Sequence, residues 1–294
     1  MSQKRMSLTR TLPDDIVEHI MSSFLPIKNA LKSRLVSKRF RHAPVQSRNL
    51  DFSSVRGTQF KVVRIIEEVF EQHKGVEINR LALNLNHKGV EDKILAWIQT
   101  CLNKNIQELE LDFSKSKKSL EIPVDFSAVQ TLTVLKLRWC KFDIPNNSPT
   151  GLKLLRTLAL MKTKVKKEML DAIFVNCIHL EILELVSCQL YGILSINAQG
   201  NQKFKTLVMY SNPKIRKFLL NAPTLECFKY DGAVRMVDFS GVNAVKEVNL
   251  LYRHTYQRKF DNMYDIAIEN MEGYTQVHVL ATTQIFLESS TIST

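Results

Sequence analysis

Apolar residues recur along the second and third hundred residues in a short phrase with nearly constant spacing. The phrase has leucine or another apolar residue at its first, fourth and sixth positions, and a small polar residue or cysteine at its ninth. The ninth positions of the five clearest copies are Ser114, Cys140, Thr163, Cys188 and Asn212. One copy alone would fit any buried amphipathic segment, but five in succession predict a repeated structural unit.

The central apolar residue of each unit sets the length of the repeat. These anchors, including weaker units before and after the five, are Leu81, Leu109, Leu135, Leu158, Leu183, Leu207, Phe228 and Val248. Successive anchors lie 20 to 28 residues apart. Leucine-rich repeats are about 20–29 residues long, so the spacing predicts a leucine-rich-repeat solenoid.

The same phrase predicts where its side chains point. Alternate residues of a strand face opposite sides, so the two apolar residues of each strand enter the core and the others face outward on a concave parallel sheet. The ninth residue is expected to turn inward and bond backbone groups of the loop that would otherwise stay unpaired. Cys140 and Cys188 are therefore interpreted as buried ladder residues.

The segments between the strands differ along the chain. Two early segments carry apolar residues at helical spacing and predict helices on the convex side. Their apolar residues are Phe60, Val63, Ile66, Val69 and Phe70, and then Val90, Ile94, Leu95, Trp97, Ile98, Cys101 and Leu102. In the later, shorter units, segments 215–220 and 234–239 have an extended pattern. The runs Lys162–Lys167 and Lys115–Lys118 are interpreted as solvated loops.

Residues 12–41 predict three short helices. Pro13 suits a first helical position, and Ile16, Ile20 and Phe24 fall on one helical face before Pro26 ends the helix. A second helix is expected over 27–36, and a third from Ser37, a residue that favours the N-cap. Because about thirty residues cannot build a large core, some of their apolar side chains must pack against the repeats or against a partner.

This N-terminal segment resembles the F-box. The resemblance rests on Leu12-Pro13-Asp14-Asp15-Ile16, on Phe24-Leu25-Pro26, and on Leu35 to Arg41, with Phe40 where the family more often has tryptophan. Residues 10–255 are similar to plant F-box/leucine-rich-repeat proteins, with further motifs at 96–113 and 221–226. The expected fold is α/β, with a three-helix F-box at 8–48, the solenoid at 49–260, and a C-terminal cap or partial extension at 261–294.

The resemblance implies a non-catalytic substrate-recognition adaptor of an SCF-type ubiquitin ligase. The F-box would bind the acidic Skp adaptor, which reaches a cullin scaffold, and the repeats would bind a protein substrate. The implied Skp contacts are Leu12, Pro13, Ile16, Ile20, Leu25, Val36 and Lys38. For Ile20 and Val36, a place in the internal core is an open alternative.

A substrate surface is expected on the concave sheet. Exposed apolar clusters often mark binding sites, and the middle strands place apolar residues at outward positions. The predicted centre consists of Met161, Val186, Val208 and Tyr210, and its edges of Lys136, Arg138 and Lys229. A loop or the C-terminal tail covering this surface is the alternative.

The positive charge is concentrated near the N-terminus. The formal net charge is +12, and residues 1–48 hold ten Lys/Arg and three Asp/Glu, a net of +7. Such a patch favours an acidic partner. Three basic helices also permit an alternative function, a nucleic-acid-binding protein on a repeat scaffold, whose binding would weaken steeply with salt. The exposed Leu12-Pro13 start and the long repeat array favour the ligase adaptor over nucleic acid.

Other function classes find no support in the motifs. No P-loop, Gly-rich dinucleotide turn, HExxH or GxSxG is present, so neither an enzyme nor a cofactor is expected. The five cysteines form no CxxC pair, which argues against zinc and against a disulfide framework, and favours the nucleus or cytoplasm. No apolar run approaches the roughly 18 residues of a membrane span.

Overall fold

The computed structural model describes residues 13, 16, 47–123, 126, 129–142, 152–212, 214–233, 235–252 and 279–282. The chain forms two compact units, Met1–Lys117 (unit 1) and Lys118–Thr294 (unit 2). The strands of both units run parallel to their neighbours, as expected for an α/β repeat solenoid.

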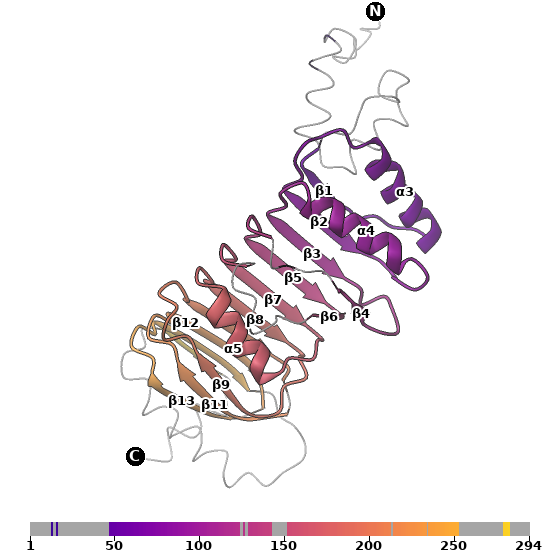
Figure 1. Cartoon of the computed structure of the whole chain (residues 1–294). Helices are drawn as coiled ribbons and strands as arrows, with labels where there is room; N and C mark the ends of the chain where they lie inside the picture. The colour runs from indigo at the N-terminus through magenta and orange to yellow at the C-terminus, as the bar shows by residue number, and fades with distance from the viewer. Residues whose placement is uncertain are drawn as a thin grey trace, which may run out of the picture. The chain divides into compact units, whose positions relative to one another are not determined.

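Unit 1 alternates strands and helices. Its elements are β1 (Asn49–Asp51), α3 (Gln59–Gln72), β2 (Arg80–Asn84), α4 (Glu91–Leu102) and β3 (Glu108–Asp112). The order of the strands is β1-β2-β3, and both helices cover the same face of this small sheet (Figure 1). The two helices predicted from the apolar stripes are therefore confirmed.

The sequence accounts for both helices locally. Thr58 caps α3, since its side chain accepts a hydrogen bond from the backbone N–H of Lys61. Glu91 and Asp92 place negative charge in the first turn of α4, where the helix dipole favours it. Phe70 of α3 stacks on Trp97 of α4 with ring centroids 5.9 Å apart, so the helices pack on each other as well as on the sheet.

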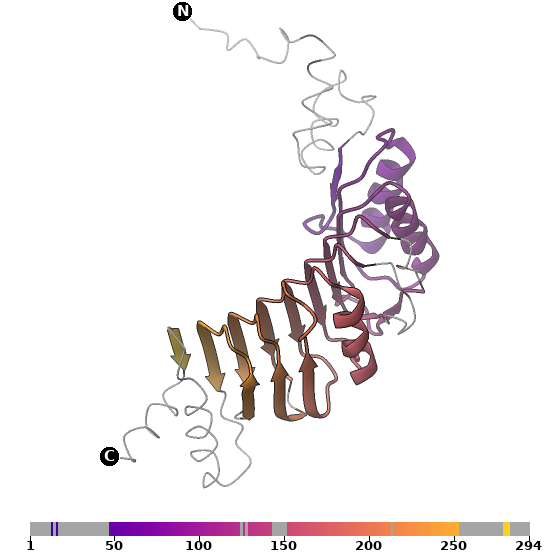
Figure 2. The same ribbon diagram turned by 60° about the vertical axis from the view of Figure 1, so that its left-hand side comes forward.

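Unit 2 has a main parallel sheet, one helix and two smaller sheets. The main-sheet strands, in spatial order, are β5 (Val134–Arg138), β7 (Thr157–Met161), β8 (Ile182–Val186), β10 (Thr206–Tyr210), β12 (Cys227–Gly232), β14 (Glu247–Tyr252) and β15 (Val279–Thr282). The other elements are β4 (Leu120–Glu121) paired with β6 (Cys140–Lys141), α5 (Lys167–Asn176), and the sheet of β9 (Gly192–Asn197), β11 (Ile215–Asn221) and β13 (Met236–Gly241). Helix α5 and the β9-β11-β13 sheet lie on the same side of the main sheet (Figure 2).

The predicted anchors occupy equivalent positions in the structure. Leu81 is paired with Leu109 in unit 1. In unit 2, the anchors pair strand by strand, in the order Leu135, Leu158, Leu183, Leu207, Phe228 and Val248. All eight are 0% exposed. The repeat length read from the sequence is confirmed residue by residue.

A recurring turn ends four consecutive strands of unit 2. The residues directly after β5, β7, β8 and β10 all have positive φ although none is glycine; they are Trp139, Lys162, Ser187 and Ser211. The backbone N–H of each donates to a carbonyl oxygen at the end of the next strand, at 2.7–2.9 Å; the acceptors are Met161, Val186, Tyr210 and Asp231. This interstrand bond stabilises a conformation that L-residues otherwise disfavour.

The ladder predicted after this turn is present. Cys188 donates its thiol to the Leu160 carbonyl at 3.1 Å, and Thr163 bonds the Cys140 carbonyl. Cys140 and Cys188 are both buried, as expected, and burial raises the pKa of the Cys188 thiol to about 11. The assignment of Ser114 to the ladder is wrong. Ser114 is exposed, and Ser116 is the buried residue there, accepting from the His87 backbone N–H.

The convex side of the later repeats is extended, as the sequence predicts. Strands β11 and β13 occupy the segments expected to be strand-like, and their inward aromatic residues meet those of the main sheet. Phe218 packs edge-on against Phe228 and Tyr230, and Phe228 packs against Phe239. This aromatic cluster joins the two sheets. The loop interpretation holds for Lys162–Lys166, but α5 begins at Lys167.

A buried histidine joins three segments of unit 1. His73, at the C-cap of α3, lies 3.0 Å from the Ser47 carbonyl oxygen through Nε2 and 3.1 Å from Lys104 Nζ through Nδ1. A lysine ammonium can only donate, so Nδ1 accepts and the ring proton sits on Nε2. Burial, and next the Lys104 charge, lower the pKa of His73 below its ordinary 6.5, although the bond to Ser47 opposes the shift.

This arrangement predicts an acid-sensitive contribution to stability. Because the folded pKa is lowered, the contribution is complete above pH 6.5 and is lost as the pH falls from 6.5 toward the folded value. His73→Gln keeps an acceptor and a donor but cannot titrate. Urea unfolding at pH 7.5 and 5.0 should show a smaller loss on acidification for the variant than for the wild type. Equal losses would contradict the assignment.

Candidate binding surface

The predicted Skp contacts lie almost entirely outside the described residues. Pro13 and Ile16 are described, and both are exposed, with Ile16 at 43%. The remaining predicted contacts, which are outside the described residues, are Leu12, Ile20, Leu25, Val36 and Lys38.

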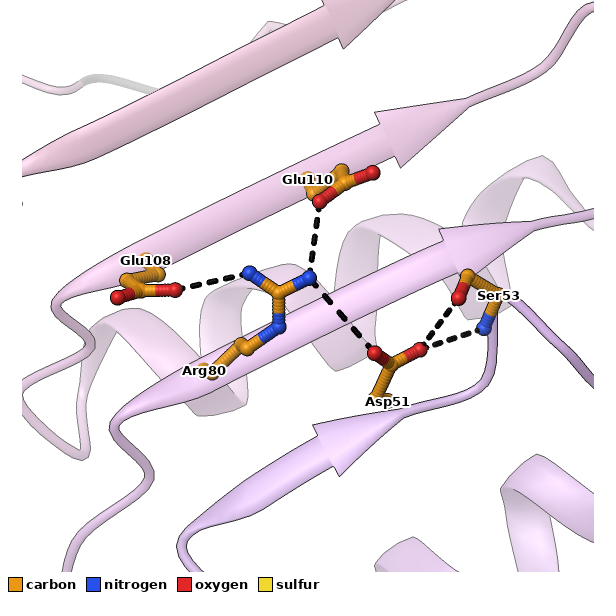
Figure 3. Close-up of polar contacts among 5 residues, drawn as sticks. All are labelled: Asp51, Ser53, Arg80, Glu108 and Glu110. Atoms are coloured by element: carbon orange, nitrogen blue, oxygen red, sulfur yellow. Dashed lines mark hydrogen bonds and ion pairs between the residues drawn. The ribbon is translucent and has the colours of Figure 1, made fainter. Parts of the chain in front are cut away.

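The sheet face opposite the helices, termed the outer face, is acidic in unit 1. Arg80 of β2 lies between β1 and β3 and binds Glu108 at 2.8 Å, Glu110 at 2.9 Å and Asp51 at 3.7 Å (Figure 3). Asp51 also accepts from the Ser53 hydroxyl at 2.6 Å. One guanidinium thus faces three carboxylates. Each group is partly exposed, so these pairs orient side chains and stabilise the unit only modestly.

The outer face of unit 2, opposite α5 and the β9-β11-β13 sheet, carries three rows of side chains in strict register. The first row is Val134, Thr157, Ile182, Thr206, Cys227 and Glu247; the middle row is Lys136, Ala159, Glu184, Val208, Lys229 and Asn249; the last row is Arg138, Met161, Val186, Tyr210, Asp231 and Leu251. Neighbours within a row sit on adjacent strands, about 4.8 Å apart.

Three of the predicted central residues come together in the last row. Met161, Val186 and Tyr210 lie on adjacent strands, and all three are half-buried. Arg138 starts the same row, with its guanidinium nitrogens 3.2 and 3.3 Å from the Met161 sulfur. The structure therefore forms a continuous apolar row bordered by a cation, as the sequence pattern indicates.

The fourth predicted central residue, Val208, is not an exposed apolar contact. It faces outward in the middle row but is only 8% exposed, since it lies between the longer Glu184 and Lys229 side chains. Ala159 in the same row is 0% exposed, between Lys136 and Glu184. The prediction erred because it considered each strand alone, while neighbouring strands decide how far a short outward side chain is covered.

The charged residues of the middle row differ in their pairing. Lys229, a predicted edge residue, pairs with Glu247 at 3.0 Å, which raises the pKa of Lys229. Lys136 and Glu184 are half-buried, and neither has an ion-pair partner among the described residues. Sequence reasoning missed Glu184 because it sought apolar outward residues. The signal was a carboxylate between two core leucines, Leu183 and Leu185.

The described part of the chain offers little support for other kinds of site. No three of its His, Cys, Asp and Glu side chains gather as metal ligands. None of its helices has the length and apolar character needed to cross a bilayer.

The parallel strands, recurring turn and inward ladder define a leucine-rich-repeat protein. Residues 69–275 match the family model described as "At1g61320/AtMIF1, LRR domain". The chain is 54% identical, over 99% of its length, to the FBD-associated F-box protein At1g61320 of Arabidopsis thaliana. It thus belongs to this family of plant F-box/leucine-rich-repeat proteins.

More distant relatives carry related names. The F-box protein At3g62230 of Arabidopsis thaliana is 24% identical over 84% of the chain, and the FBD-associated F-box protein At5g56370 of the same plant is 27% identical over 75%. The chain spans 63%, 58% and 53% of the lengths of these three relatives. The similarity to At1g61320 extends past residue 255, further than the sequence motifs indicate.

Proposed function

We propose that this protein is a non-catalytic substrate-recognition adaptor of an SCF-type ubiquitin ligase. The N-terminal segment at 8–48 binds a Skp-type adaptor, and through it a cullin scaffold. The solenoid at 49–260 holds a protein substrate for ubiquitination, followed by a C-terminal cap or extension at 261–294. The complex acts in the nucleus or cytoplasm.

The F-box motif attached to a repeat array carries this proposal. The motif from Leu12 to Arg41 is rich in apolar residues for its length, and relatives that match nearly the whole chain are named F-box proteins. An excess of positive charge over residues 1–48 favours an acidic adaptor. The half-buried apolar row Met161, Val186 and Tyr210 supports substrate binding on unit 2.

Binding to the adaptor is tested by co-expression of the full chain with a Skp-type adaptor. The wild type should retain the adaptor on an affinity column, also at 0.5 M salt, since an apolar contact resists salt while nucleic-acid binding does not. Leu12→Ala should weaken retention by roughly 30-fold, the effect of losing a binding hot spot of about 2 kcal/mol. Ile193→Ala, which alters another exposed apolar residue, serves as the matched control. A wild-type chain that retains no Skp adaptor would overturn the proposal.

Substrate binding is tested separately with Tyr210→Ala. Aromatic residues in such rows commonly contribute about 2 kcal/mol to binding, so captured substrate should fall by more than ten-fold while Skp retention stays unchanged. Quantitative mass spectrometry of the purified complex measures both at once. Full substrate capture by the variant would show that Tyr210 does not contribute to substrate binding.

A further inference from the structure

The two unpaired charges of the middle row lie at a defined spacing. Lys136 is on β5 and Glu184 is on β8, with only β7 between them. Two strand spacings of about 4.8 Å separate their Cα positions by about 10 Å. Lys229 continues the row two strands beyond Glu184, but Glu247 already neutralises it. Among the described residues, the row thus offers one cation and one carboxylate without ionic partners.

The short side chains beside Glu184 are covered by their longer neighbours, so a bound chain would meet the charged ends of Lys136 and Glu184 and not the backbone of the sheet. Ala159 separates Lys136 from Glu184, and Val208 follows Glu184 on the other side. Both lie low in the row, at 0% and 8% exposure. A thin extended segment laid across the strands fits this profile better than a helix, whose width of roughly 10 Å would span neighbouring rows.

The spacing selects one extended conformation. In a polyproline II helix every third residue points the same way, and three residues rise by about 9.3 Å. This rise matches the roughly 10 Å between Lys136 and Glu184. In a β-strand, residues three apart point to opposite faces and could not reach both charges. The adjoining Met161, Val186 and Tyr210 offer the apolar and aromatic contacts on which such segments dock.

We propose that the middle row of unit 2 binds a polyproline II segment of the substrate, with an acidic residue over Lys136 and a basic residue three positions away over Glu184. Residues next to the basic one are proline or apolar and pack on the last row. The proposal rests on the proposed function and specifies the substrate class that the solenoid recognises. Glu184 is the specificity-determining residue for the basic side chain.

Two synthetic probes test the spacing. Each is a fluorescent eight-residue peptide that is proline apart from one glutamate and one arginine, with the charges three positions apart in the first and two in the second. The full chain is titrated into each, and anisotropy is recorded. The first peptide should bind about five-fold more tightly, because only it places both charges over Lys136 and Glu184.

Variants assign the effect to the two residues. Glu184→Gln and Lys136→Gln should each reduce the five-fold preference to about one, whereas Glu168→Gln, an exposed control on α5, should preserve it. Equal binding of both peptides by the wild type, or no saturable binding of either, would overturn the proposal. So would a preference that survives Glu184→Gln. Leu12→Ala should leave peptide binding intact, so failure here is distinguishable from failure of Skp binding.

Discussion

Replacement of Phe228 by alanine is expected to lower the free energy of unfolding by about 3–5 kcal/mol. Phe228 is an anchor of the repeat and is 0% exposed. Its ring centroid lies 5.9 Å from that of Phe218 on β11 and 5.6 Å from that of Phe239 on β13. Truncation removes two ring contacts between the main sheet and the second sheet and leaves only that of Phe218 with Tyr230, and packed strands cannot close the resulting cavity.

Urea unfolding followed by circular dichroism measures the effect. Phe60→Ala provides a control with the same change of side chain, because Phe60 on α3 is 77% exposed and its loss should cost less than about 1 kcal/mol. Similar destabilisation by the two variants would show that the aromatic cluster does not carry the expected packing energy.

Asn212→Ala is expected to destabilise the chain by roughly 2–6 kcal/mol. Asn212 is 1% exposed and joins two backbone groups of the preceding repeat. Its Nδ2 donates to the Leu185 carbonyl at 2.8 Å, and its Oδ1 accepts from the Cys188 N–H at 2.8 Å. Alanine leaves both backbone groups buried and unpaired, and each unpaired group costs about 1–3 kcal/mol.

The matched control is Asn243→Ala, which truncates an exposed asparagine in the same unit. Its unfolding midpoint in urea should stay close to that of the wild type. If Asn212→Ala matched this control, the ladder would be dispensable, and the turn after β8 would depend on its interstrand backbone bond instead.

The two outer faces suggest different roles. In unit 1, Arg80 pairs with Asp51, Glu108 and Glu110, so all four side chains are engaged within one cluster that keeps a net negative charge. In unit 2, Lys136 and Glu184 have no ion-pair partner among the described residues, and an apolar row runs beside them. The proposed substrate surface therefore lies on unit 2. In unit 1, by contrast, the ion pairs order the outer side chains.

Some local features were predictable and others were not. Helices α3 and α4 followed from apolar stripes broad enough to show a helical period, and the structure adds the Thr58 cap of α3 and the acidic first turn of α4. Helix α5 was not predicted from the sequence, because its apolar stripe is short and lysines precede it. Ser114 and Ser116 could not be told apart, since Phe113 enters the core and shifts the inward position by two residues.

The sequence by itself determined the repeat. The spacing of Leu-x-x-Leu-x-Leu fixes which residues are inward, and identical units stack only in register, so all eight anchors follow from the chain alone. Only the tertiary structure decided what the outer face offers. The exposure of Val208 and the pairing of Lys229 depend on residues one strand away, about 20 positions distant in sequence. No local sequence pattern identifies those neighbours. That Glu184 has no ion-pair partner among the described residues is therefore visible only in the folded structure.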